Sequence, residues 1–280
     1  MVTQQLRPYH TVAVSPDGSR LAVSTAGLSD DLWSYDPGRD SWTRLTSEKD
    51  ATRPVWSPDG ERIAFGWNKA GAYNVYSIPP DGSGPPVQLT DGLHWSFPLT
   101  WSPEGETLVF QRQDPSTSED LWTLSVTEGL STRPLLATRF YEGSAALSPD
   151  GHWLAYASNE SGRLEIYVQS FPDLTDKVAI SSGGGSNPRW SHDGRELFYR
   201  SPGRMMRIQV NLEGGFRAGA TETLFDTDLD SGRLLGTYDV TADGLRFLMI
   251  REPEQDREAS QIVVVPNFAL ELKEKVPDGN

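Results

Sequence analysis

A tight-turn tetrapeptide occurs six times along this chain, each time between the same two apolar patterns. From the acidic residue of one copy to that of the next, the steps are 42, 45, 46, 43 and 50 residues. The copies begin at Ser15, Ser57, Ser102, Ser148, Ser191 and Thr241, and the last two are degenerate. A period of roughly 40–50 residues made of short strands is typical of the blades of a β-propeller.

Each residue of the tetrapeptide Ser-Pro-Asp-Gly suits a hairpin turn. Proline presets φ at the second position, Ser and Asp side chains accept hydrogen bonds from nearby backbone donors, and Gly adopts a positive φ. A short strand precedes each copy, as in Pro54-Val55-Trp56, and a β-rich run follows it, as in Ile63-Ala64-Phe65. A third strand follows in every repeat and a fourth in the first five. The sequence therefore predicts an all-β, six-bladed β-propeller of four-stranded antiparallel blades.

We expect residues 1–280 to form a single β-propeller domain, because strand patterns run from end to end without a linker-like stretch. The sixth repeat lacks a fourth strand, and Gln4-Gln5-Leu6 resembles the fourth strand of the second repeat. An N-terminal strand at 3–7 is therefore predicted to complete the last blade, which removes an exposed sheet edge. The predicted blades are 8–46, 47–90, 91–137, 138–181, 182–226 and 227–265 plus 3–7.

The chain beyond Pro266 has a different pattern, which predicts a short helix over 267–276. Asn267 is a suitable N-terminal cap, and Phe268, Leu272 and Val276 recur at helical spacing on one face. We expect this apolar face to pack against the propeller, with docking to another domain as the alternative.

Composition excludes several classes of function. The formal charge of −14 argues against nucleic acid or an anionic membrane surface as the partner. The absence of cysteine excludes disulfides, thiol catalysis and Cys-ligated zinc. No apolar run approaches the ~18–20 residues that span a membrane, and the N-terminus lacks the layout of a signal peptide. We expect a monomer that is cytoplasmic, or extracytoplasmic or periplasmic if the chain is a piece of a membrane-anchored protein.

Motifs of common enzymes are missing from the sequence. It contains no Gly-x-Ser-x-Gly, Gly-x-x-x-x-Gly-Lys or His-Glu-x-x-His. Among its four histidines, only His10 and His94 lie in connections that lead into innermost strands, and two blades separate them. The sequence therefore predicts no catalytic residue, no cofactor and no metal site.

One rim of the predicted ring is chemically varied. It carries the connections between blades together with the loops at 66–73, 111–119, 157–164 and 251–260. Aromatic side chains with neighbouring Arg and His are typical of binding hot spots. The candidate binding residues are His10, Arg53, His94, Trp95, Phe140, Tyr141 and Glu142. The alternative, which the sequence supports equally, is that these aromatic rings only fill gaps between blades near the mouth of the central tunnel.

The run Trp-Ser-Pro-Asp-Gly-x-x-Ile-Ala-Phe at 56–65 resembles the TolB-type, WD-like β-propeller repeat of bacteria, and this resemblance extends over the whole chain. In the second half, the segments 147–163, 190–199, 247–250 and 267–272 are similar to the C-terminal propellers of bacterial membrane-anchored serine/threonine kinases and of some winged-helix regulators. The resemblance implies a sensory or protein-docking domain without its effector domain, and it carries over no catalytic residue.

The leading hypothesis is a non-catalytic sensor or interaction module that binds a protein or peptide on its loop-rich rim. One alternative is the propeller part of an enzyme, either a peptidase gated by its propeller or a lyase or lactonase. The lyase or lactonase alternative requires His10 and His94 to lie near carboxylates at the tunnel mouth. The peptidase alternative requires a hydrolase domain, which this chain lacks. The other alternative is a small-molecule sensor that uses the central tunnel.

Overall fold

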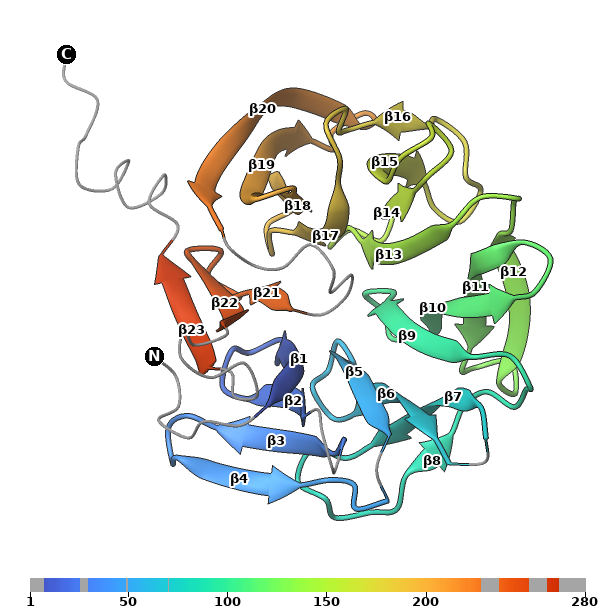
Figure 1. Cartoon of the computed structure of the whole chain (residues 1–280), viewed down its shortest axis with the longest axis vertical. Coiled ribbons are helices and arrows are strands. Elements are labelled where there is room, and N and C mark those ends of the chain that lie inside the picture. The colour runs from blue at the N-terminus through green and yellow to red at the C-terminus, as the bar shows by residue number, and fades with distance from the viewer. Residues whose placement is uncertain are drawn as a thin grey trace.

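The computed structural model describes residues 8–25, 30–48, 50–69, 71–227, 237–251 and 261–266. Within these ranges the protein is all β, with 23 strands in six antiparallel sheets. Figure 1 shows the sheets arranged as blades around a common centre. The predicted six-bladed β-propeller is therefore confirmed. None of the described residues forms a helix long and apolar enough to cross a membrane.

In the first three blades the chain runs from an innermost strand outward through three neighbours, and each strand pairs with the next. Blade 1 contains β1 (Tyr9–Val14), β2 (Leu21–Thr25), β3 (Leu32–Asp36) and β4 (Ser41–Arg44). Blade 2 contains β5 (Ala51–Trp56), β6 (Ile63–Asn68), β7 (Tyr73–Ile78) and β8 (Val87–Gln88). Blade 3 contains β9 (Ser96–Trp101), β10 (Thr107–Asp114), β11 (Ser118–Ser125) and β12 (Ser131–Leu136).

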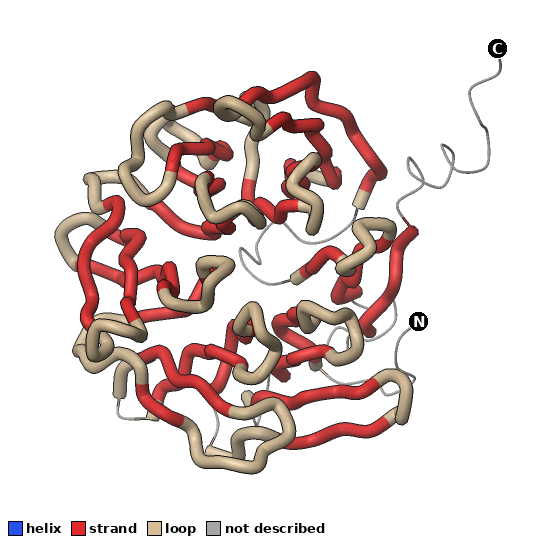
Figure 2. Tube along the Cα trace, turned by 180° about the vertical axis from the view of Figure 1, so that it is seen from behind, coloured by secondary structure: helices blue, strands red, loops and turns tan. Residues whose placement is uncertain are grey.

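The same order continues around the ring, as the reverse view shows (Figure 2). Blade 4 contains β13 (Glu142–Leu147), β14 (Trp153–Ser158), β15 (Glu165–Ser170) and β16 (Val178–Ala179). Blade 5 contains β17 (Ser186–Trp190), β18 (Glu196–Ser201), β19 (Arg204–Asn211) and β20 (Arg217–Asp226). Blade 6 contains β21 (Tyr238–Val240), β22 (Arg246–Arg251) and β23 (Gln261–Pro266).

Two terminal predictions concern residues that the structure does not describe. The strand at 3–7 and the helix at 267–276 both lie outside the described residues, so closure of the last blade by the N-terminal strand stays a prediction. The sixth sheet has three strands within the described ranges.

The prediction of a loop over 111–119 is wrong. β10 and β11 continue as a paired hairpin through Gln113 and Glu119, and only residues 115–117 connect them. Polar residues continue these strands, with Arg112 directly opposite Asp120. Opposite charges across an antiparallel pair are favourable, so polarity alone does not end a strand.

All six turns that follow the innermost strands share one set of hydrogen bonds. In each turn the glycine N–H donates to the carbonyl of the Ser or Thr three residues earlier, at 2.8–3.0 Å. The hydroxyl of that Ser or Thr accepts the N–H five residues further on, at 2.9–3.2 Å. The six glycines have φ of 68–74°, a left-handed conformation that favours glycine. The degenerate copies, with His192 and Ala242 in the proline slot, therefore keep the same turn.

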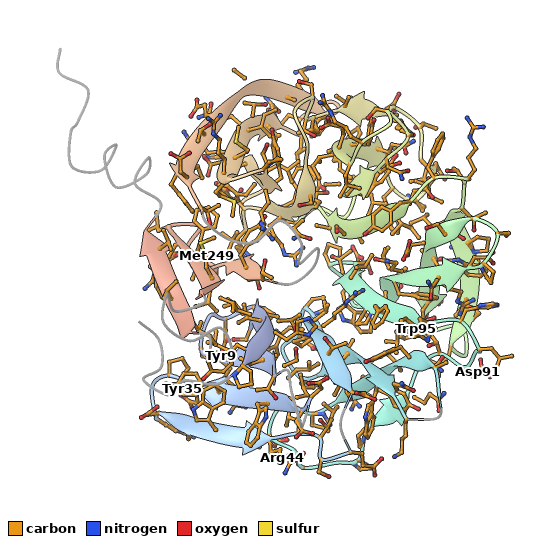
Figure 3. The ribbon with its side chains drawn as sticks, in the orientation of Figure 1. Tyr9, Tyr35, Arg44, Asp91, Trp95 and Met249 are labelled. Carbon is orange, nitrogen blue, oxygen red and sulfur yellow. The ribbon has the colours of Figure 1, made fainter. Side chains whose placement is uncertain are left out.

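The core lies mainly between neighbouring blades. Phe65 and Trp67 of blade 2 pack against Ala22 and Leu32 of blade 1. Blade 6 closes on blade 1 in the same way, because Leu248, Ile250 and Ile262 form one cluster with Val12, Val23 and the two tyrosines labelled in Figure 3, Tyr9 and Tyr35. Contact between the first and last blades completes the ring of apolar interfaces.

Tryptophans at the ends of innermost strands link neighbouring blades. The indole N–H of Trp56 donates to the carbonyl of Ala13 at 3.2 Å, and that of Trp190 donates to Ala146 at 3.0 Å. Trp101 occupies the equivalent place in blade 3, but its buried indole nitrogen has no hydrogen-bond partner. Comparing Trp101 with Trp56 and Trp190 therefore isolates the contribution of the hydrogen bond between blades.

We expect Trp190→Phe to lower the free energy of unfolding by about 1–3 kcal/mol, because it leaves the Ala146 carbonyl without its donor. Trp101→Phe removes an unpaired buried N–H, so this variant should lose roughly 1 kcal/mol less of the free energy of unfolding. Denaturant unfolding of both variants measures the difference. Equal losses would contradict a contribution from the hydrogen bond between blades.

The turn aspartates predict a dependence of stability on pH. Hydrogen bonds from the Ser15 hydroxyl and from Ser19 lower the pKa of Asp17 to about 2. Hydrogen bonds from the Ser57 hydroxyl and the Glu61 N–H lower the pKa of Asp59. A carboxylate whose pKa is depressed by folding stabilises the protein above its unfolded pKa, and the contribution is lost as pH falls through the folded value.

The double variant Asp17→Asn/Asp59→Asn should be less stable than the native chain at pH 7 by at most ~1 kcal/mol, since both carboxylates are exposed and screened. The difference should shrink between about pH 4 and pH 2 as the native carboxylates become protonated. Urea unfolding at several pH values measures it. A difference in stability that stays constant over this range would show that the ionised carboxylates do not stabilise the fold.

Candidate functional site

The connections between blades and the loops between second and third strands lie at the same end of the innermost strands, and we call this end the connection rim. The opposite end carries the six glycine turns. Among exposed large hydrophobic side chains, Leu93 is 91% and Trp95 46% exposed, and both belong to the connection from β8 to β9. Figure 3 shows Trp95 beside blade 3. The connection rim therefore presents apolar groups to solvent.

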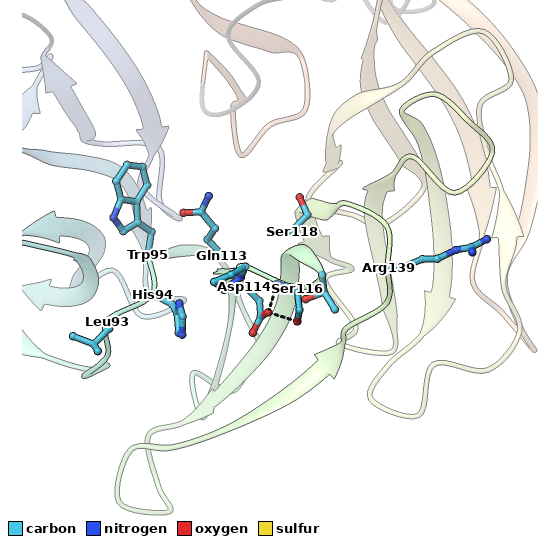
Figure 4. Close-up of a pocket in the computed structure, with 10 residues that line it drawn as sticks. Leu93, His94, Trp95, Gln113, Asp114, Ser116, Ser118 and Arg139 are labelled. Atoms are coloured by element: carbon cyan, nitrogen blue, oxygen red, sulfur yellow. Dashed lines mark hydrogen bonds between the residues drawn. The ribbon is translucent and has the colours of Figure 1, made fainter.

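A hollow of about 640 Å³ lies beside these two residues, and we call it the rim hollow. Its walls are the connection into β9, the tip of the β10–β11 hairpin and the start of the next connection (Figure 4). It is lined by Leu93, His94, Trp95, Gln113, Asp114, Pro115, Ser116, Thr117, Ser118 and Arg139. The lining combines an apolar edge with one cationic, one anionic and several uncharged polar groups.

The hairpin wall of the rim hollow is held by local hydrogen bonds. Asp114 accepts the Ser116 backbone N–H at 2.8 Å and the Ser116 hydroxyl at 2.5 Å. The hydroxyl bond and then the backbone bond lower the pKa of Asp114, so its carboxylate stays ionised. Thr117 donates to the buried Asp120 at 2.7 Å. The tip of the hairpin is therefore preorganised.

Aromatic rings connect the rim hollow to the centre of the ring. Trp95 packs edge-on against Tyr73 with centroids 5.4 Å apart, and Tyr73 packs against Phe97 at 4.9 Å. The guanidinium carbon of Arg53 lies 3.9 Å from the Phe97 ring centroid. A Cβ at Gly66 would lie 2.6 Å from the Phe97 ring, so glycine is required there for the ring to take this place. We call the row of Trp95, Tyr73 and Phe97 the aromatic ladder.

The candidate binding residues Phe140, Tyr141 and Glu142, which lie between β12 and the start of β13, differ in burial. Phe140 is half-buried under the side chain of Arg139, at 4.9 Å. Tyr141 is half-buried with its hydroxyl directly over Gly143. Glu142 is buried and accepts hydrogen bonds from the Thr138 hydroxyl and N–H. Burial raises the pKa of Glu142, and these bonds oppose the shift. Glu142 therefore holds the connection together through Thr138.

The two rim histidines have different surroundings. His10 lies in β1 with its Nδ1 3.3 Å from the Thr52 hydroxyl, whereas His94 forms part of the wall of the rim hollow. Within the described ranges, no group of three or more His, Asp and Glu side chains could hold a metal ion.

Sequence reasoning missed Tyr73 and Leu93. Leu93 carried a readable signal, since it is an apolar residue between a Gly and a His and outside any strand pattern. Tyr73 looked like the end of a loop, but it begins β7 and joins the ladder. Arg112 belongs neither to the lining of the rim hollow nor to the ladder, and its guanidinium carbon lies 4.3 Å from the Trp122 ring centroid and 5.1 Å from that of Phe110.

Comparison with protein families finds no family model that matches this chain. Among curated proteins, the peptidase YuxL of Bacillus subtilis is 26% identical over an alignment of 190 residues that covers 52% of this chain and 28% of YuxL. The chain thus spans about a quarter of the length of that relative. The protein Atu1656 of Agrobacterium fabrum is 25% identical over 247 residues, covering 85% of this chain and 82% of its own.

Solved structures with a similar fold include TolB from Acinetobacter baumannii, with a TM-score of 0.67, 15% identity and coverage of 92% of this chain and 61% of that one. A TolB-like protein from Agrobacterium tumefaciens has a TM-score of 0.65 and 22% identity, with 79% and 81% covered. An oligogalacturonate lyase in complex with manganese has a TM-score of 0.59 and 13% identity, with 95% and 91% covered. The comparisons therefore support a TolB-type β-propeller fold for this chain.

Proposed function

We propose that this propeller is a non-catalytic interaction or sensor module that binds a protein or peptide at the rim hollow. The observation that carries the proposal is the pair of exposed side chains, Leu93 and Trp95, at the edge of this hollow. Exposed apolar groups bordered by polar residues are typical of interaction sites. Trp and Arg are also enriched among the residues that dominate binding energy.

The chemistry of the rim hollow fits a peptide with one apolar and one charged side chain. Leu93 and Trp95 offer an apolar surface, while Arg139 and Asp114 offer one charge of each sign. The aromatic ladder fixes Trp95 from behind, and Asp114 fixes the hairpin tip, so little ordering is needed on binding. A preorganised surface loses less entropy on association.

The acidic character of the chain also supports this choice of partner. A formal charge of −14 repels nucleic acid and anionic membranes, but it does not oppose a peptide of mixed or basic character. The resemblance to propellers of membrane-anchored kinases is consistent with a docking role.

The likeness to YuxL supports a second candidate, the propeller part of a peptidase. In that case the connection rim would face a catalytic domain instead of a separate protein. The two candidates share the same surface, so the identity of the bound protein separates them.

We expect Leu93→Ser/Trp95→Ala to abolish capture of a partner from an extract of the source cells without lowering the melting temperature by more than a few degrees. The matched control is Leu130→Ser, because Leu130 is 39% exposed but lies in the turn between β11 and β12. Quantitative affinity capture with native, double-variant and control baits measures the loss. A partner enriched equally by all three baits would contradict the rim assignment, and a partner with a hydrolase domain would favour the peptidase reading.

A further inference from the structure

A second, smaller hollow lies at the centre of the ring, between innermost strands of blades 1 to 5, and we call it the central hollow. Its volume is about 30 Å³. It is lined by Thr11, Val12, Arg53, Pro54, Val55, Pro98, Leu99, Ser144, Ala145 and Arg189. Both charged residues in this lining are arginines, and none of its ten residues is acidic. This local excess of positive charge contrasts with the formal charge of −14 of the chain.

The backbone is shaped to turn Arg53 towards the centre. Pairing of β5 with β6 shifts register between Thr52 and Val55, and Arg53 has a φ of 54° within this bulge. The equivalent residues of blades 4 and 5, Ser144 and Asn187, have φ of 52° and 53°. A left-handed conformation is uncommon outside glycine, and bulges often redirect a side chain next to a functional site.

Arg53 is half-buried, and one of its guanidinium donors is buried without a partner. It stacks on Phe97, but its buried Nη1 has no hydrogen-bond partner. Arg53 takes part in no ion pair with any described residue. Arg189, by contrast, pairs with Asp239 at 3.5 Å and donates to the Pro188 carbonyl at 3.0 Å.

Burial lowers the pKa of Arg53, while Tyr141, Glu119 and Tyr73 oppose the shift. Glu119 is thus near enough to act on Arg53 electrostatically without pairing with it. An arginine nevertheless stays protonated in proteins, so the positive charge remains. A buried donor without a partner is costly, and the cost is removed when an anion accepts its hydrogen bond.

Ser144 lines the central hollow together with Arg53. Its hydroxyl donates to Asn187 at 3.2 Å, and the buried Nδ2 of Asn187 has no hydrogen-bond partner. Burial raises the pKa of the Tyr141 hydroxyl, and the side chain of Ser144 and the charge of Arg53 oppose the shift. The Ser144 hydroxyl thus adds a polar group to the lining of the hollow.

We propose that the central hollow binds the carboxylate of a small organic acid, held by the guanidinium of Arg53, with the Ser144 hydroxyl in the same lining. A planar guanidinium matches a carboxylate through two parallel hydrogen bonds. The hollow is about as large as the share of one water molecule in the liquid, ~30 Å³, so it admits one small group and not a whole metabolite. The remainder of the acid lies towards the connection rim, along the aromatic ladder, which favours an aromatic acid.

This site and the rim hollow both adjoin the aromatic ladder, but their polar residues differ. Arg53 lines the central hollow alone, and Leu93 and His94 line the rim hollow alone. A variant of Leu93 therefore tests partner docking, and a variant of Arg53 tests acid binding. Either proposal can be wrong while the other holds.

The test is saturation-transfer NMR and calorimetry with benzoate, its neutral analogue benzamide, and inorganic phosphate, on the full chain. We expect benzoate to bind, benzamide to bind at least about tenfold more weakly, and Arg53→Gln to weaken benzoate at least about tenfold, since a hydrogen-bonded charge pair contributes about 1.5–3 kcal/mol. Gln keeps a long side chain at the same φ. The matched control is Arg112→Gln, which removes another stacked guanidinium of the same rim and should leave binding unchanged.

Three results would overturn the proposal: no benzoate binding by the native chain, equal binding of benzoate and benzamide, or equal loss in the Arg53 and Arg112 variants. Binding of phosphate in preference to benzoate would overturn the carboxylate assignment. Arg53→Gln should melt at or above the native temperature because it removes a buried guanidinium donor that has no partner. If it does not fold, Arg53→Lys keeps the charge but loses the planar fork, and undiminished benzoate binding by that variant would also overturn the proposal.

Discussion

The hydrogen-bonded glycine turn after each innermost strand is the constraint on which the rest of the structure depends. The same three positions form it in all six blades, including the two where proline is absent. It fixes the register between the first and second strands, and therefore which residues face the next blade. The Trp56 and Trp190 hydrogen bonds and the apolar clusters between blades all follow from that register.

Because one end of every innermost strand is fixed in this way, the innermost strands vary at their other end. Bulges, connections of different length and the long β10–β11 hairpin all lie on the connection rim. Such an arrangement places adaptable loops on a rigid scaffold, which is where binding residues commonly occur. The rim hollow and the central hollow both lie at this variable end. The first is bordered by exposed apolar side chains, and the second is lined by Arg53, whose buried Nη1 has no partner.

The period of the tetrapeptide was sufficient to predict the blades and nearly every strand, since short-range turn chemistry sets both. Burial on the rim was not predictable from the same pattern. Glu142 and Trp95 both stand in connections rich in aromatic residues, yet one is buried against Thr138 and the other is 46% exposed. The difference depends on contacts between blades that are far apart in sequence. The stacking of Arg53 on Phe97 likewise needs Gly66 from a third strand, and no local signal marks that combination.

The central claim, that partners bind at the connection rim, is tested most directly by photo-crosslinking in living source cells. A photoreactive amino acid replaces Leu93 in one chain and Leu130 in another, and crosslinked products are identified by mass spectrometry. The account predicts one reproducible protein adduct from position 93 and none from position 130. An adduct formed equally from both positions, or only from position 130, would contradict it.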